Sequence, residues 1–165
     1  MRLWQRFLLL AACAATLSTI AVTTAFASPP EAISGNVTYQ SSTFNSIRVE
    51  GGNTIIDLSA TVSYSGTFTG TSQLHGTLII HKDGSANAHD VEVFTGTVDG
   101  VPGTVTLNLN LSSDPAFVVT GKDVITDASG DLTGLRGLLT VNAQVLDPLV
   151  GPVGTYGGQI EGLGS

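Results

Sequence analysis

The sequence predicts an all-β protein built from antiparallel strands with one buried and one exposed face. Thr, Val, Gly, Ser and Asn dominate the chain after residue 27, a composition typical of strands joined by tight turns. Apolar and polar residues alternate with a period of two along several segments, and no helical period is visible after residue 27. Turn-forming residues separate these segments at intervals of roughly ten residues, which is typical of a sandwich or an up-and-down barrel.

Four segments place apolar side chains on a single face. In chain order, the apolar positions are Val62, Tyr64 and Phe68; Leu74, Leu78 and Ile80; Val105, Leu107, Leu109 and Leu111; and Leu139, Val141, Ala143 and Val145. A further strand over residues 88–97 is ambiguous, because Glu92 shares a face with Phe94 while Val91 and Val93 share the other. Each segment is therefore predicted to be a half-buried strand.

The predicted turns fall between these strands. Asp83-Gly84 is a strong signal for a short hairpin, and residues 99–103, 112–115 and 128–130 supply the next corners. The segment Leu146 to Gly158 contains Pro148, Pro152 and several glycines. We expect a long loop there, followed by a last strand near residues 156–161.

The N-terminal segment has the pattern of a secretory signal peptide. Arg2 and Arg6 precede an apolar run over residues 7–22, and Ala25-Phe26-Ala27 forms a small-residue cleavage site. We expect cleavage after Ala27 and a secreted or extracytoplasmic protein with no membrane span. Two alternatives are an uncleaved anchor and a lipid anchor at Cys13, which would leave a second apolar run on the mature protein.

Charge and cysteine content exclude several classes of function. The chain carries 13 acidic and 6 basic residues, and a surface with this balance repels nucleic acids and anionic membranes. Cys13 is the single cysteine, so the secreted form would have no disulfide, no thiolate nucleophile and no cysteine metal site.

From about Ala60 to Glu161, the sequence resembles the bacterial domain-of-unknown-function family numbered 3224. The matching residues are Gly84-Ser85-Ala86, the segment 92–97, Gly100, Gly103-Thr104, the segment Ser129–Gly137 and Tyr156. That family is similar in fold to the allene-oxide-cyclase and dirigent barrels, so the resemblance implies an eight-stranded antiparallel β-barrel of the calycin type. The family has no assigned activity. We therefore expect a signal peptide (1–27), an N-terminal extension with variable strands (28–59) and a barrel domain (60–165).

Four residues are candidates for chemistry or ligand binding. Glu92 would lie in an apolar barrel if Phe94 faces inward, and burial would then raise its pKa and suit it to acid–base catalysis. Alternatively, Glu92 is solvated, or forms an ion pair with Arg136. Tyr64 is a second catalytic candidate, and Phe94 and Tyr156 are candidates for binding a ligand.

No metal site and no cofactor are expected. His75 and His81 are too far apart along one strand to share a metal, and no ligand spacing supports His89. Asp127 and Asp131 flank a turn that lacks the ligand pattern of a calcium loop.

The sequence leaves three functions open. The first is a non-enzymatic module that binds a small apolar molecule in the barrel lumen. The second is a cyclase- or isomerase-type enzyme that uses a buried carboxylate. The third is a homo-oligomeric surface or matrix protein that associates through its Thr-, Asn- and Ser-rich outer faces.

Overall fold

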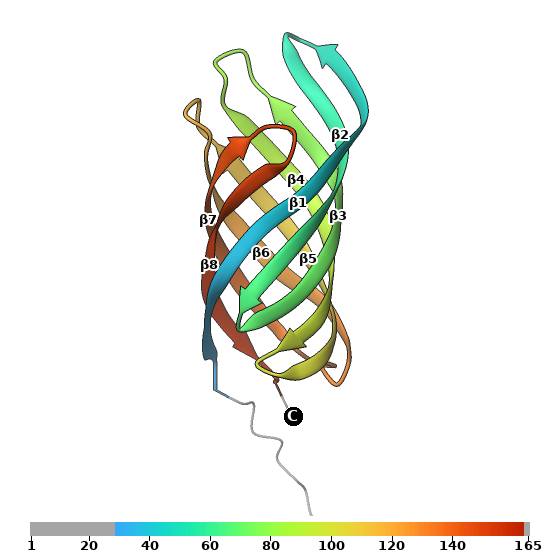
Figure 1. Cartoon of the computed structure of the whole chain (residues 1–165), viewed down its shortest axis with the longest axis vertical. Helices are drawn as coiled ribbons and strands as arrows, with labels where there is room; N and C mark the ends of the chain where they lie inside the picture. The colour runs from blue at the N-terminus through green and yellow to red at the C-terminus, as the bar shows by residue number, and fades with distance from the viewer. Residues whose placement is uncertain (1–28, 164–165) are drawn as a thin grey trace, which may run out of the picture.

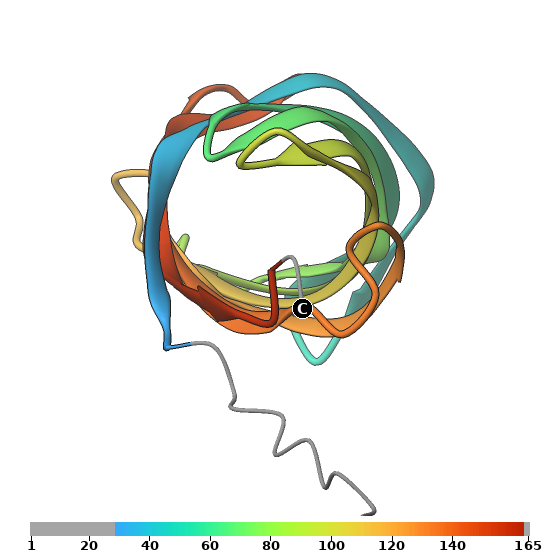
Figure 2. The same cartoon turned by 90° about the horizontal axis from the view of Figure 1, so that it is seen from below.

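The computed structural model describes residues 29–163 and contains a closed barrel of eight antiparallel strands (Figures 1 and 2). The strands are β1 (Glu31–Glu50), β2 (Asn53–Gly66), β3 (Phe68–Ile80), β4 (Ala86–Val98), β5 (Val101–Ser113), β6 (Val118–Gly130), β7 (Arg136–Asp147) and β8 (Gly151–Glu161). Each strand pairs with its neighbours in the sequence, and β8 pairs with β1. The predicted all-β antiparallel barrel is confirmed. The signal-peptide prediction concerns residues that lie outside the described part. The described residues contain no helix with the length and apolarity needed to cross a membrane.

The segment 28–59, set apart as an extension by the sequence pattern, contributes β1 and half of β2 to the ring. β1 pairs with β2 along most of its length and with β8 over residues 31–38. The register of the β1–β2 pair shifts between Tyr39 and Ser41 and again between Phe44 and Ser46. Each shift moves the inward-facing positions by one residue. This strand therefore lacks a continuous period-two pattern and was missed as a barrel strand.

The long loop predicted over residues 146–158 is wrong. β7 continues to Asp147 and β8 begins at Gly151, so the connection is a turn of residues 148–150. Pro152 is compatible with β8 because the ladder between β8 and β1 begins only at Val153. Gly151 and Pro152 thus lie where the β1–β8 ladder ends, and both residues still belong to β8.

The turns between the strands lie at two opposite ends of the barrel. The turns at residues 51–52, 81–85, 114–117 and 148–150 form one end, called the upper end because it lies at the top of Figure 1. The lower end carries the turns at residues 67, 99–100 and 131–135 together with both ends of the described chain (Figure 2).

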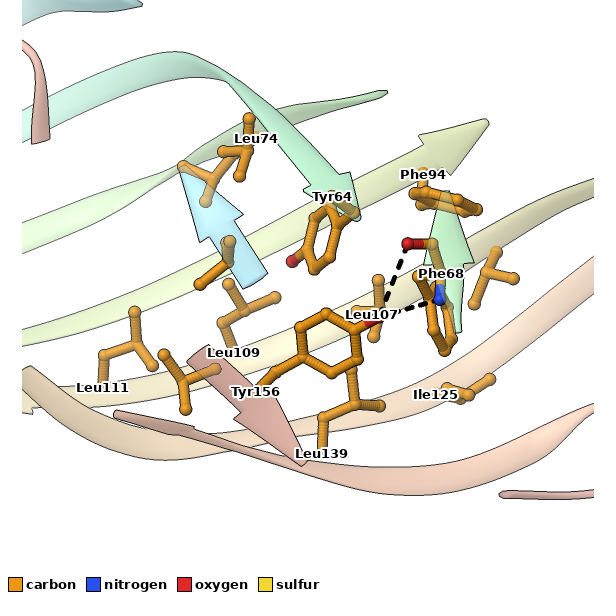
Figure 3. Packing of buried hydrophobic residues seen from close by; sticks show 14 of the residues in the cluster. Tyr64, Phe68, Leu74, Phe94, Leu107, Leu109, Leu111, Ile125, Leu139 and Tyr156 are labelled. Carbon is orange, nitrogen blue, oxygen red and sulfur yellow. Dashed lines mark hydrogen bonds between the residues drawn. The ribbon is translucent and has the colours of Figure 1, made fainter. Parts of the chain in front are cut away.

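Aromatic side chains fill the lower half of the lumen. Tyr64, Phe68, Phe94 and Tyr156 come from β2, β3, β4 and β8, and the centroids of their contacting rings lie 5.2–6.2 Å apart (Figure 3). Edge-on and tilted ring pairs at this separation add to the stabilisation from burial. The opposite face of β4 points to solvent. This half of the barrel is therefore a packed core.

The turn between β6 and β7 closes the lower end. Gly130 and Gly134 adopt left-handed φ angles of 72° and 89°, and the Thr133 hydroxyl donates to the Gly130 carbonyl at 2.7 Å. This compact turn directs Leu132 and Leu135 into the barrel, where both are buried. Gly103 lies directly beside Leu132, and a side chain at position 103 would collide with it. The segment Ser129–Gly137, one of the segments that carry the family resemblance, thus closes the lower end of the barrel and is called the plug below.

Shortening this plug is expected to destabilise the protein. Leu132→Ala removes a fully buried side chain and leaves a cavity, so the free energy of unfolding should fall by about 2–5 kcal/mol. The matched control is Leu138→Ala on the exposed outer face of β7, which should cost less than about 1 kcal/mol. Chemical denaturation measures both values. Equal losses in the two variants would contradict the assignment of Leu132 as a plug.

Candidate functional site

The upper half of the lumen is hollow. A cavity of about 280 Å³, here called the lumen cavity, lies among the upper parts of all eight strands, and the residues that line it are mostly apolar. Its walls include the small side chains of Ser42, Ala86 and Ala88, which leave open the space that aromatic rings occupy lower down. Phe44, Phe117 and Leu149 line the cavity and are also exposed, so they form an apolar rim at its mouth.

Three carboxyl groups lie inside the described part of the barrel, beneath this cavity. Asp90 and Glu92 project inward from β4, and Asp123 projects inward from β6; their exposed fractions are 6%, 1% and 1%. Asp90 and Asp123 both pair with Leu109 of β5, one on each side. The backbones of these two aspartates are therefore about 10 Å apart, the width of two strand spacings.

Asp90 lies at the floor of the lumen cavity. Its Oδ1 atom is placed over Gly76, at the position that a Cβ atom of residue 76 would occupy, and has no hydrogen-bond partner. A backbone hydrogen bond from Thr77 reaches the same carboxyl group. Burial raises the pKa of Asp90 to about 6, and nearby His89 and His75 oppose this increase. The absence of a side chain at Gly76 makes room for this inward carboxyl group.

Glu92 is held by two hydroxyl groups. Ser72 donates a short hydrogen bond to Oε1, and Tyr64 donates to Oε2 at 3.2 Å. Burial raises the pKa of Glu92 to about 7, although both hydrogen bonds lower it. Both oxygens of Glu92 accept hydrogen bonds, and the residue does not line the lumen cavity. Its carboxyl group is therefore part of the packed layer between the cavity and the aromatic core.

Asp123 has no hydrogen-bond partner at either carboxyl oxygen. Burial and, to a smaller extent, the charges of Glu92 and Asp90 raise its pKa to about 8. It borders a void of about 10 Å³ that Tyr39 and Glu92 also line, a space of about one water molecule. Burial and the charges of all three acids raise the pKa of Tyr39 well above its ordinary range.

The structure places the two catalytic candidates inside the barrel but away from the lumen cavity. Glu92 faces inward with Phe94, while Val91 and Val93 are 48% and 42% exposed. The alternative ion pair between Glu92 and Arg136 does not form, because Arg136 lies outside and contacts Glu161 at 3.2 Å. Tyr64 lies beside Glu92 and borders only the small void.

The two ligand-binding candidates belong to the aromatic core. Phe94 is fully buried among the rings of Phe68 and Tyr64. The Tyr156 hydroxyl accepts a hydrogen bond from the backbone N–H of Phe68 at 2.8 Å and lies 3.4 Å from the Phe68 carbonyl oxygen (Figure 3). Tyr156 thus reaches over Gly35 of β1 and ties β8 to the start of β3. Neither residue lines the lumen cavity.

The three histidines and the aspartates near the β6–β7 turn do not line the lumen cavity. His75 contacts Asp57 at 3.8 Å, His81 contacts Asn87 at 2.8 Å and His89 contacts Asn110 at 2.7 Å. Asp127 and Asp131 are both exposed near the lower end. Within residues 29–163, no three His, Cys, Asp or Glu side chains are arranged to hold a metal ion.

Sequence reasoning missed Asp123 and the position of Asp90 at the cavity floor. Along β6, apolar residues occur on both faces, so the alternation does not show which face is buried. A signal was nevertheless present, because Asp123 shares its face with Val119 and Ile125 while Lys122 lies on the other. A charged lysine indicates the solvent side, and this places Asp123 inside.

Comparison with known proteins identifies a family. The model of a family described as a protein of unknown function, DUF3224, matches residues 33–146. The match begins in β1 and ends in β7, so it includes most of the segment that the sequence pattern set apart. No curated protein matches the chain.

The buried acids make stability depend on pH. The pKa of Asp123 increases from 3.8 to about 8 on folding, so the folded chain binds more protons than the unfolded chain between these values. The contribution of Asp123 to stability is therefore fully present below pH 3.8 and is lost as the pH rises through this range towards 8. We expect the midpoint of thermal unfolding to be about 5 °C or more lower at pH 8 than at pH 5.

Asp123→Asn tests the cause of this dependence. The variant should gain stability at pH 8 relative to the unmodified protein and should have a flatter pH profile. Asp127→Asn, on the exposed side of the same strand, is the matched control and should leave the profile unchanged. Identical profiles for all three proteins, measured by thermal unfolding from pH 5 to 8, would show that Asp123 does not carry the effect.

Removing the Tyr156 hydroxyl should weaken the lower core. Tyr156→Phe leaves the buried N–H of Phe68 without an acceptor, so the free energy of unfolding should decrease by about 1–3 kcal/mol. Tyr39→Phe is the matched control, because no side-chain hydrogen bond is found for Tyr39 within the described residues. Chemical denaturation of the two variants measures the difference, and an equal loss in both would argue against the Phe68 hydrogen bond.

Proposed function

The chain belongs to the DUF3224 family of proteins of unknown function, and we propose that it is an extracytoplasmic binding protein that holds one small apolar molecule in the lumen cavity. The observation that carries this proposal is the contrast between the two halves of one barrel. The lower half is packed with aromatic rings, whereas the upper half encloses about 280 Å³ among apolar walls. Apolar pockets with few polar groups are typical of small-molecule sites.

The size of the cavity sets the size of the ligand. A dry apolar cavity of about 150 Å³ accommodates benzene, which has six non-hydrogen atoms. By proportion, the lumen cavity of about 280 Å³ accommodates a molecule of about 11 non-hydrogen atoms. A hydrocarbon chain of about ten carbons with a small head group fits this limit.

The rim of the cavity supports entry from the upper end. Phe44, Phe117 and Leu149 are exposed although they are large apolar side chains, and all three also line the cavity. Exposed apolar groups around a concave site are typical of ligand entrances. The signal-peptide pattern at residues 1–27 supports an extracytoplasmic location.

A second candidate function is an acid–base enzyme of the cyclase or isomerase type. The observation that favours it is the Asp90 carboxyl at the floor of an apolar cavity, with a pKa raised by burial to about 6. A group with a pKa near the working pH transfers protons efficiently. Recovery of the bound molecule distinguishes the two functions, because a binding protein returns its ligand unchanged.

Filling the cavity tests the proposed function. We expect 1-decanol to bind the protein with a Kd between about 1 and 100 μM, since burial of each CH₂ group contributes about 0.8 kcal/mol before the costs of association. Ala88→Phe places a large ring in the cavity and should weaken this binding at least tenfold. Titration calorimetry measures both affinities.

The matched control is Ala32→Phe, the same substitution on the exposed face of β1. It should bind 1-decanol as the unmodified protein does, and circular dichroism should show the same strand content for both variants. Absence of binding to the unmodified protein, or equal binding to the Ala88→Phe variant, would refute the proposal.

A further inference from the structure

The lumen cavity contains one charged residue, and it lies at the deepest point. Of the described residues that line the cavity, Asp90 alone carries a formal charge; the others are apolar, small or hydroxyl-bearing. Its side chain is more than nine-tenths buried, and its Oδ1 atom has no hydrogen-bond partner. A molecule that fills the cavity from the upper end therefore reaches the Asp90 carboxyl group, whose Oδ1 atom is packed over Gly76.

The charge inside the barrel has no counter-charge in the described residues. Glu92 and Asp123 add two further acids below Asp90, whereas the basic side chains of these residues are all exposed: Arg48, Lys82, Lys122 and Arg136. The histidines nearest to Asp90, His75 and His89, lie on the outer face of the barrel. A buried carboxylate without a partner is unfavourable, and a cation placed beside it relieves that penalty.

The position of the acids limits how deep a ligand can reach. Asp123 and Glu92 border only the void of about 10 Å³, which is too small for any group larger than a water molecule. Asp90 is thus the acid within reach of the ligand, and the other two act on it through space. The head group of the ligand stops at Asp90 while its body lies against the apolar walls above.

These observations identify the chemical class of the ligand. We propose that the lumen cavity selects an apolar amine, a hydrocarbon of about ten carbons whose ammonium group donates hydrogen bonds to the Asp90 carboxylate. This inference rests on the proposed function and specifies it. A fatty acid of the same length would place a second carboxylate beside Asp90, and like charges at this depth repel. An alcohol would fill the cavity without forming the charge pair.

Three probes of equal chain length test the inference at pH 7.4: 1-decylamine, 1-decanol and decanoic acid. At this pH the amine is protonated and the fatty acid is ionised. The unmodified protein should bind the amine at least tenfold more tightly than the alcohol, and the acid more weakly than the alcohol. Titration calorimetry on the protein that begins at Ser28 gives the three affinities.

Two variants isolate the contribution of Asp90. Asp90→Asn keeps the shape of the side chain and removes its charge, so the preference for the amine should fall to less than threefold while the affinity for 1-decanol stays the same. Retained binding of 1-decanol also shows that this variant is folded and its cavity intact. Glu50→Gln removes an exposed acidic charge at the upper end and should keep the full preference for the amine.

The outcomes separate this inference from the proposed function. If 1-decanol binds but the amine is not preferred, or if the preference survives in the Asp90→Asn variant, the amine class is refuted and the apolar binding site stands. Tighter binding of decanoic acid than of 1-decanol refutes the amine class in the same way. If none of the three probes binds, both proposals are refuted.

Discussion

The fixed width of an eight-stranded ring is the constraint on which the rest of this structure depends. Such a ring encloses an interior that inward side chains just fill, so the size of each inward residue determines whether a layer is packed or open. In the lower half, rings such as Phe68 and Phe94 occupy this space and a turn supplies Leu132 to seal it. In the upper half, Ala86 and Ala88 face the same interior and leave it open. The cavity follows from side-chain size along otherwise regular strands.

The same constraint makes the interior acids costly. Apolar residues at the positions of Asp90 and Asp123 would continue the core. A buried carboxyl group without a partner either keeps its proton, with a raised pKa, or lowers the stability of the fold when it ionises. The pKa of each acid is raised because burial disfavours its charged form, and their mutual repulsion adds to this for Asp123. The Asp90 carboxyl group also requires glycine at position 76, because a Cβ atom there would collide with it. Stability does not account for this arrangement, and clusters of this kind are typical of functional sites.

The sequence predicts the architecture better than it predicts the site. Strands with regular alternation, such as residues 104–111, were predicted with the correct inward face, because period two directly reports burial on one side. β1 was set apart because two register shifts interrupt its alternation, and β8 was shortened because Pro152 lies where its ladder with β1 ends. Glu92 was a candidate because it shares a face with Phe94. The position of the lumen cavity could not be predicted, since it depends on how residues from all eight strands meet across the barrel. The similarity to allene-oxide-cyclase barrels stays a prediction.

The order in which the interior acids ionise indicates what charge a ligand meets. The pKa values are about 6 for Asp90, about 7 for Glu92 and about 8 for Asp123. Asp90, at the cavity floor, is therefore the first to lose its proton as the pH rises, and its charge then opposes ionisation of the other two. Of the three acids, the one that borders the cavity therefore ionises most readily and Asp123 least readily. One carboxyl group at the floor of an apolar site matches a monovalent organic cation. A divalent metal ion requires several ligating oxygens close together, and the described acids do not form such a group.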